Sequence, residues 1–170
     1  MNNRLKIGLV LDDTLDKPDG VQAAVLDIGK ELSSRGHEVH YLVTDTKRDD
    51  IKNVHSLGGF VSLPFNGNSV RTPKPASRRT IKKLLNSLDL DVLHVQMPYS
   101  PLMAGRVVAS AGEDTKVFGT FHILPYDRLT SIGTKLLGIF LKKNLNKFDG
   151  FFAVSKPARV FMKDTFGVDG

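Results

Sequence analysis

Short apolar runs recur along the chain, and longer segments with helical spacing separate them. The first run, LKIGLVL at 5–11, is rich in branched aliphatic residues and stops at two aspartates, which is typical of a buried strand. The next segment has apolar residues three or four positions apart and ends at Arg35-Gly36, a cation followed by a glycine C-cap. With a second strand at 38–43 this makes one βαβ unit, whose crossover should be right-handed.

The alternation continues to the carboxyl end. Further strands are expected at 54–57, 60–63, 91–95, 116–121 and 150–154, and further helices at 78–88, 101–112, 129–146 and 157–166. We therefore predict an α/β fold, a Rossmann-like, doubly wound and mostly parallel sheet with helices on both faces. The 170 residues fit a single domain, 1–170. Residues 64–75 contain three prolines and an Asn-Gly pair, and we expect a long irregular loop there.

The composition excludes several kinds of site. The chain has no cysteine, which excludes disulfides and thiolate metal sites, and its five histidines show no metal-ligand spacing. Neither a G-x-G-x-x-G after the first strand nor a G-x-S-x-G elbow is present. We expect no metal or cofactor in this domain. The amino end has no secretory signal and no apolar stretch approaches the roughly 20 residues that span a bilayer, so we expect a cytoplasmic protein.

Positive charge is concentrated in one part of the chain. The formal net charge is +6, yet residues 51–88 contain seven lysines and arginines and no acidic residue. Leucines and an isoleucine occupy one side of the helix expected at 78–88. The other side, called the basic face below, consists of Arg78, Arg79, Lys82 and Lys83.

The basic face is typical of a site for a polyanion, although a solvated helix face has the same pattern. The helix either packs its apolar side on the sheet or lies in a membrane interface with its leucines in lipid. In both arrangements each cation contributes on the order of 1 kcal/mol at an anionic bilayer. No interleaved aromatic residues and no helix-turn-helix, RNA-binding or zinc motif accompany the basic face. We therefore expect an anionic membrane surface as partner, and no nucleic acid.

Two residues are expected near the carboxyl edge of the sheet, where open parallel sheets bind ligands. His122 directly follows the apolar run at 116–121. It is either a partly buried structural histidine or a residue that lines a cleft. Gly20 begins the first helix, where free backbone amides and the positive end of the helix dipole suit a phosphate. A glycine before a helix is also common in plain turns.

Several short stretches occur in the order and spacing seen in the amino-terminal domain of family 4 retaining glycosyltransferases of the GT-B fold. They are Pro18-Asp19-Gly20-Val21-Gln22, Arg35-Gly36-His37-Glu38-Val39, Asp91-Val92-Leu93-His94-Val95, Thr120-Phe121-His122 and Ala153-Val154-Ser155. Within that family the chain most resembles phosphatidylinositol mannosyltransferases, through Pro64-Phe65-Asn66-Gly67 and the basic segment at 78–85. The resemblance covers nearly the whole chain.

The resemblance implies a two-domain enzyme whose amino-terminal half binds the acceptor and whose other half binds a nucleotide sugar, a GDP- or UDP-sugar. It assigns the catalytic contact with the transferred sugar to His122 and a contact with the donor pyrophosphate to Gly20. It assigns contacts with the acceptor to Gln22, Asn66 and Arg71. Such enzymes retain the anomeric configuration by attack on the face that the nucleotide leaves, so positioning matters more than a strong base.

We therefore expect the acceptor-binding half of a mannosyltransferase-like enzyme that transfers a sugar to a lipid headgroup resembling phosphatidylinositol. The protein would be peripheral at the inner face of the cell membrane. The donor-binding domain is missing from these residues, so we expect the chain to be inactive alone. Two alternatives remain, a soluble family member with a small or saccharide acceptor and a non-enzymatic module that binds a polyanion such as nucleic acid.

Four positions depart from the family pattern. Asp19 stands where members have the first glycine of a Gly-Gly pair, and Asp13 where inositol-using enzymes have an aromatic residue. Gln96 replaces a common second histidine, and Asp127 replaces a lysine on the acceptor side. The resemblance implies that these changes concern the contacts with donor and acceptor.

Overall fold

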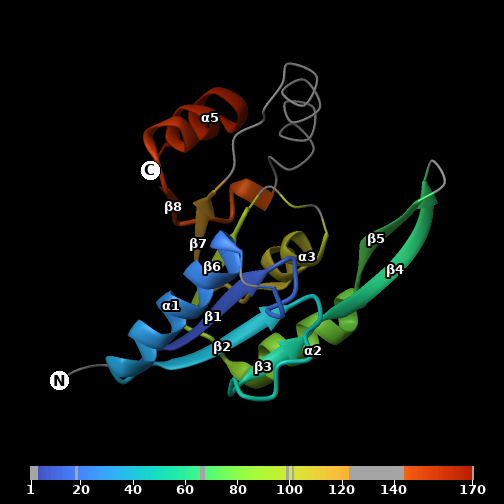
Figure 1. Ribbon diagram of the computed structural model, residues 1–170. Coiled ribbons are helices and arrows are strands. Elements are labelled where there is room, and N and C mark those ends of the chain that lie inside the picture. The colour runs from blue at the N-terminus through green and yellow to red at the C-terminus, as the bar shows by residue number, and fades with distance from the viewer. Residues whose placement is uncertain are drawn as a thin grey trace.

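A computed structural model of the protein describes residues 4–17, 19–65, 68–98, 100, 102–122 and 144–169. Parallel strands form a six-stranded sheet in the order β3-β2-β1-β6-β7-β8 (Figure 1). They are β1 (Lys6–Leu11), β2 (Glu38–Val43), β3 (Val54–Ser56), β6 (Val92–Gln96), β7 (Lys116–Phe121) and β8 (Gly150–Ala153). The helices among the described residues are α1 (Gly20–Ser34), α2 (Arg78–Leu88), α3 (Met103–Ser110) and α5 (Lys156–Phe166). The helix predicted at 129–146 lies outside the described residues except for its last three positions.

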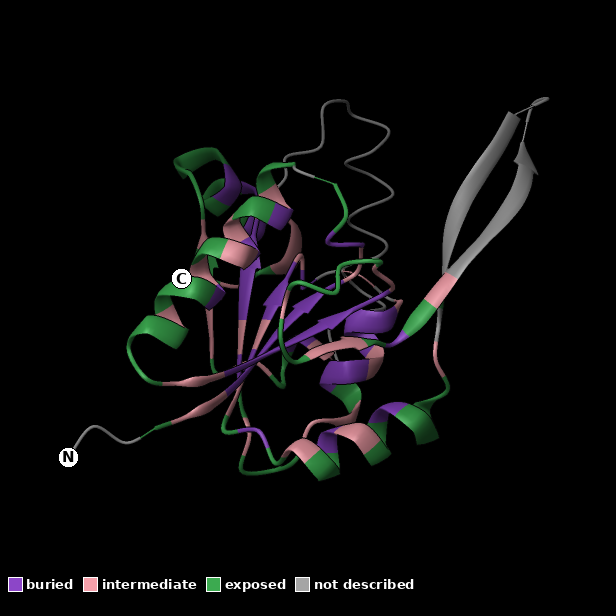
Figure 2. Cartoon of the chain, turned by 60° about the horizontal axis from the view of Figure 1, so that its bottom comes forward, coloured by how far each residue is buried: buried purple, intermediate pink, exposed green. Residues whose placement is uncertain are grey.

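Helices cover both faces of the sheet, which confirms the predicted fold class. One face of β1 and β2 packs against α1 around Val25. The opposite face packs against α2 through Ile81 and against α3 through Val107. A smaller cluster with Phe121 and Phe161 joins α5 to the sheet. Figure 2 shows the buried strands between helices whose outer sides are exposed.

Local signals in the sequence set the helix ends. The hydroxyl of Ser77 accepts a hydrogen bond from Thr80 N at 3.1 Å, so this residue caps α2. Ser155 caps α5 in the same way. Gly36 and Gly167 follow α1 and α5 in the left-handed region, with φ of 91° and 68°, where glycine has no steric penalty.

The segment 64–75 is not the irregular loop that its prolines predicted. β4 (Gly58–Phe65) and β5 (Asn68–Pro75) pair in antiparallel register, from Gly58 opposite Pro75 to Phe65 opposite Asn68. Proline lacks an N–H, but a two-stranded ribbon has free outer edges where that loss is tolerated. The Asn-Gly pair in the sequence between the strands is a strong hairpin signal, which the loop prediction did not use. Figure 1 shows the ribbon extending away from the six-stranded sheet.

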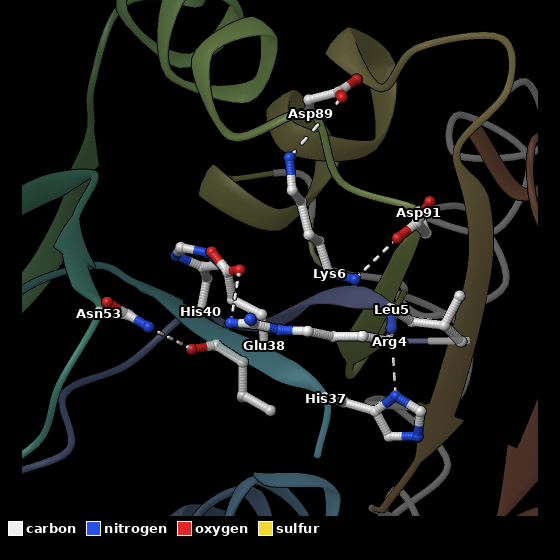
Figure 3. A network of polar contacts seen from close by, with 10 residues as sticks. Arg4, Leu5, Lys6, His37, Glu38, His40, Asn53, Asp89 and Asp91 are labelled. Atoms are coloured by element: carbon white, nitrogen blue, oxygen red, sulfur yellow. Dashed lines mark hydrogen bonds and ion pairs between the residues drawn. The ribbon is translucent and has the colours of Figure 1, made fainter. Parts of the chain in front are cut away.

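Polar contacts hold the amino edge of the sheet together (Figure 3). His37 Nδ1 accepts a hydrogen bond from Leu5 N at 3.2 Å, and Asp91 Oδ2 accepts one from Lys6 N at 2.7 Å. These bonds tie the start of β1 to the residues that precede β2 and β6. Two ion pairs reinforce this edge, Arg4–Glu38 and Lys6–Asp89. The polar residues of the amino edge therefore have a structural role.

Candidate functional site

The carboxyl ends of β1, β6 and β7 bring polar side chains to one edge of the sheet. Asp12 and Asp13 follow β1, Gln96 ends β6, and His122 follows β7. The parallel register pairs Gln96 with Thr120, so the ends of β6 and β7 lie at the same level. We call this region the carboxyl-edge site, because ligands of open parallel sheets bind at this edge.

His122 is partly buried at the carboxyl-edge site. Its Nε2 lies 2.6 Å from Oε1 of Gln96. The Gln96 side chain is fully buried. An amide oxygen only accepts hydrogen bonds, so Nε2 carries the proton of this bond and Nδ1 is left as an acceptor. Burial lowers the pKa of His122 below its ordinary value, which keeps the ring neutral at neutral pH. A neutral ring of this kind can accept a hydrogen bond from a hydroxyl group.

His94 lies on β6, two residues before Gln96, and its side chain is engaged in contacts within the fold. Its Nε2 lies 2.7 Å from Oγ1 of Thr120, and its ring packs edge-on against Phe152 with a centroid distance of 5.8 Å. Burial, with a smaller effect of the nearby His122, lowers the pKa of His94 to about 4. The histidine is therefore neutral over the physiological range.

Asp12 connects the end of β1 to the start of α3. Its Oδ1 accepts a hydrogen bond from Ala104 N at 2.8 Å, and the hydroxyl of Ser100 donates to Oδ2. Burial raises the pKa of Asp12, while these hydrogen bonds act in the opposite direction. The carboxylate is therefore engaged within the fold, as an anchor for the first turn of α3.

Gly20 begins α1, as predicted, and is exposed. A Cβ added there would have no neighbour within 4 Å, so a ligand can approach this backbone closely. The preceding Asp19 is the N-cap, and its Oδ1 accepts hydrogen bonds from Val21 N at 3.0 Å and Gln22 N at 3.2 Å. Asp19 thus engages two amides of the helix start and places a negative charge beside Gly20. The helix start is less open to an anion than its glycine alone predicts.

Gln22 is buried, with 1% of its surface exposed. Its Nε2 donates to Oδ2 of Asp13 at 3.1 Å, and its Oε1 is buried without a hydrogen-bond partner among the described residues. The structure therefore links Gln22 to the carboxyl-edge site through Asp13. Its assigned contact with an acceptor stays a prediction.

The other two predicted acceptor residues belong to the ribbon segment. Asn66 lies outside the described residues. Arg71 lies on β5, paired with Ser62 of β4. The roles assigned to both residues stay predictions.

The basic face is solvent-exposed at all four positions. None of its residues takes part in the ion pairs found within the described part of the chain. On the other side of α2, Ile81 and Leu85 are buried in the core. The interpretation in which this apolar side enters lipid is therefore wrong, and the arrangement with the apolar side on the sheet is confirmed.

None of the described helices combines the length and apolar character needed to cross a bilayer. No group of three or more histidine or carboxylate side chains in the described ranges is placed to hold a metal ion.

Comparison with known proteins decides the family. The profile of Glycosyltransferase Family 4 matches residues 18–170, nine tenths of the chain. The chain belongs to glycosyltransferase family 4.

Relatives within the family agree with the resemblance found in the sequence. A phosphatidyl-myo-inositol mannosyltransferase of Mycolicibacterium smegmatis is 32% identical over 170 residues, which cover 97% of this chain and 42% of the relative. The Mycobacterium tuberculosis protein of the same name is 32% identical over 167 residues, 97% of this chain and 43% of the relative. A Propionibacterium freudenreichii protein of that name is 28% identical over 165 residues. The chain thus spans about two fifths of the length of these curated relatives.

Solved structures with the same fold are also glycosyltransferases. An alpha-glucosyltransferase in complex with UDP-glucose and DNA containing an abasic site has a TM-score of 0.60 and 16% identity, covering 96% of this chain and 40% of that chain. An alpha-glucosyltransferase in complex with UDP and a 13-mer DNA containing a HMU base has a TM-score of 0.55 and 13% identity, covering 89% of this chain and 38% of that chain. At these identities the likeness shows the fold, that of a Rossmann-like domain of GT-B glycosyltransferases, as predicted.

Two contacts at the carboxyl-edge site were not predicted from the sequence. Gln96 was noted as a departure from the family, but its bond to His122 joins residues 26 positions apart. The bond between Asp12 and Ser100 joins residues 88 positions apart. No local pattern signals such contacts, because they depend on the order and register of the strands.

Proposed function

We propose that this chain is the acceptor-binding half of a retaining glycosyltransferase that transfers a sugar to the headgroup of an anionic lipid at a membrane surface. Its similarity to phosphatidyl-myo-inositol mannosyltransferases over 97% of its length carries this proposal. The lipid headgroup is of the phosphatidylinositol kind. The protein is peripheral, at the cytoplasmic face of the membrane.

In this proposal the donor is a nucleotide sugar held by a second domain, across a cleft from the carboxyl-edge site. The coverage of about two fifths of each relative supports such a division into halves. Gly20 offers its amide to the donor pyrophosphate, and its open surroundings support that role. Asp19 restricts this contact to the amide of Gly20, because it engages the next two amides.

His122 contacts the transferred sugar in the proposed mechanism. Its half-buried ring is neutral, and Nδ1, the nitrogen without a proton, is an acceptor. Such a ring holds a sugar hydroxyl by a hydrogen bond and does not add a charge to the site. This agrees with a reaction in which alignment of donor and acceptor, more than proton transfer to a strong base, lowers the barrier.

The basic face holds the enzyme on the lipid surface. Four exposed cations on one helix contribute on the order of 1 kcal/mol each near an anionic bilayer. The apolar side of α2 stays in the protein core, so the attraction is electrostatic and weakens with salt.

Co-sedimentation with vesicles tests the membrane part of the proposal. We expect the protein to sediment with vesicles that contain phosphatidylinositol and to remain in solution with neutral phosphatidylcholine vesicles. Replacement of Arg78, Arg79, Lys82 and Lys83 by Ser should reduce the partition coefficient about tenfold or more.

A matched variant controls for total charge. It replaces four exposed lysines on other parts of the surface, Lys17, Lys30, Lys47 and Lys156, by Ser. We expect this variant to bind anionic vesicles nearly as well as the unchanged protein. Equal binding of the unchanged protein to neutral and anionic vesicles, or equal loss in both variants, would contradict the proposed role of the basic face.

A further inference from the structure

Gln96 occupies an unusual position for a polar side chain. It is fully buried at the end of β6, with 0% of its surface exposed. Its Oε1 contacts His122, but its Nε2 is buried without a hydrogen-bond partner among the described residues. A buried amide with an unpaired donor destabilises a fold, so an apolar residue of similar size would suit the core better. Among the described residues, the side chain of Gln96 forms its hydrogen bond with His122.

The backbone around Gln96 holds this side chain in place. The next residue, Met97, has φ of 53°, in the left-handed region that residues other than glycine rarely adopt. Met97 N donates to Thr120 O at 2.9 Å, which fixes the end of β6 against β7. His122 follows Thr120 by two residues. A strained backbone that persists because its surroundings hold it is typical of positions where geometry matters to function.

We propose that Gln96 is a positioning residue, which holds the His122 ring in its Nε2–H tautomer so that Nδ1 is the atom left to accept a hydrogen bond from substrate. This inference rests on the proposed contact between His122 and the transferred sugar. The acceptor oxygen of Gln96 sets both the tautomer and the orientation of the ring, 2.6 Å from Nε2. Gln96 is buried and acts through His122.

The residue type at this position also keeps the histidine neutral. An amide has no charge, whereas a carboxylate at the same place would stabilise the imidazolium and raise the pKa of His122. Among the described residues, His94 interacts electrostatically with His122, and burial keeps His94 neutral as well. A glutamine therefore supplies the hydrogen bond without altering the protonation state that the site needs.

NMR spectroscopy of the imidazole nitrogens tests this inference without substrate. In the unchanged protein we expect His122 to be present almost entirely as the Nε2–H tautomer. Gln96→Leu should yield a mixture of tautomers, and Gln96→Glu should raise the pKa of His122 by about one unit or more. Gln96→Met is a second apolar variant for the case that the leucine variant does not fold.

Thr44→Val is the matched control, since Thr44 is buried at the end of β2 and its Oγ1 also has no partner among the described residues. We expect this variant to leave the His122 signals unchanged. A His122 ring in the Nδ1–H tautomer in the unchanged protein, or an unchanged tautomer in Gln96→Leu and Gln96→Met, would overturn the inference.

Turnover of the full-length protein separates this inference from the proposed function. If Gln96 positions His122 for catalysis, Gln96→Leu lowers kcat about tenfold or more while its melting temperature stays equal or rises. A changed tautomer with unchanged kcat would support the role of Gln96 toward His122 and contradict the catalytic role of His122. A loss of kcat with an unchanged tautomer would contradict the positioning role itself.

Discussion

Burial keeps the histidines next to the carboxyl-edge site neutral, and this links stability to pH. The pKa of His94 is lowered to about 4, against 6.5 for an exposed histidine. Between these values the unfolded chain binds a proton that the folded protein does not bind, so acidification favours the unfolded state. His55 and His122 have pKa values lowered by burial and act in the same direction.

We predict that the free energy of unfolding falls as the pH decreases from about 6.5 toward 4. The contribution of His94 to this loss is roughly 3 kcal/mol. Urea denaturation at a series of pH values measures it. His94→Leu should show a clearly smaller decrease over this window, and a decrease equal to that of the unchanged protein would show that His94 is not its source.

At the level of single residues, the sequence predicted where a residue lies in its strand or helix but not its hydrogen-bond partner. The break after the apolar run at 116–121 placed His122 at a strand end, and a glycine at the start of a helical pattern placed Gly20 at a helix start. The bond between His122 and Gln96 depends on the register of β6 and β7. The capping bonds of Asp19 could have been predicted from the sequence, because aspartate is a strong N-cap residue and Asp19 directly precedes the helix.

Helix α1 packs closely on β2 at one small residue. A Cβ at Gly29 would overlap the ring and hydroxyl of Tyr41, whose side chain is itself buried in the core. We predict that Gly29→Ala lowers the free energy of unfolding by about 1–3 kcal/mol through overpacking, as measured by urea denaturation.

Gly20 in the same helix provides the comparison, because a Cβ there meets no atom within 4 Å. Gly20→Ala should change the free energy of unfolding by less than about 0.5 kcal/mol. Equal destabilisation by the two substitutions would show that the loss comes from the replacement of glycine in general and not from contact with Tyr41.

At the level of elements, periodicity identified the six-stranded sheet and the middle of β4, at 60–63, but not β5. Apolar runs predicted the strands of the central sheet, and helical spacing predicted the helices that cover it. Strands buried on both faces are apolar along their whole length, so they are easily recognised in the sequence. The ribbon of β4 and β5 carries prolines, which argue against a strand within a sheet but not on a free edge. The prediction failed because it applied the rule for central strands to a two-stranded element.

At the level of the whole molecule, the carboxyl-edge site and the basic face lie on different parts of the surface. The carboxyl-edge site lies at the ends of β1, β6 and β7, while the basic face lies on α2, on the side of the sheet opposite α1. In the proposed function the basic face holds the protein on an anionic lipid surface, and the carboxyl-edge site receives the headgroup. The separation means that loss of the basic face should affect binding to lipid and leave the geometry around His122 intact.

Transfer of labelled sugar by the full-length protein tests the central claim most directly. The protein is incubated with radiolabelled GDP-mannose or UDP-glucose and with vesicles that contain phosphatidylinositol, and the products are separated into lipid and aqueous phases. We predict that label enters the lipid phase, and that His122→Ala, still folded by circular dichroism, reduces this transfer at least about a hundredfold. Label that appears only in a water-soluble saccharide, or transfer that persists in His122→Ala, would contradict the account.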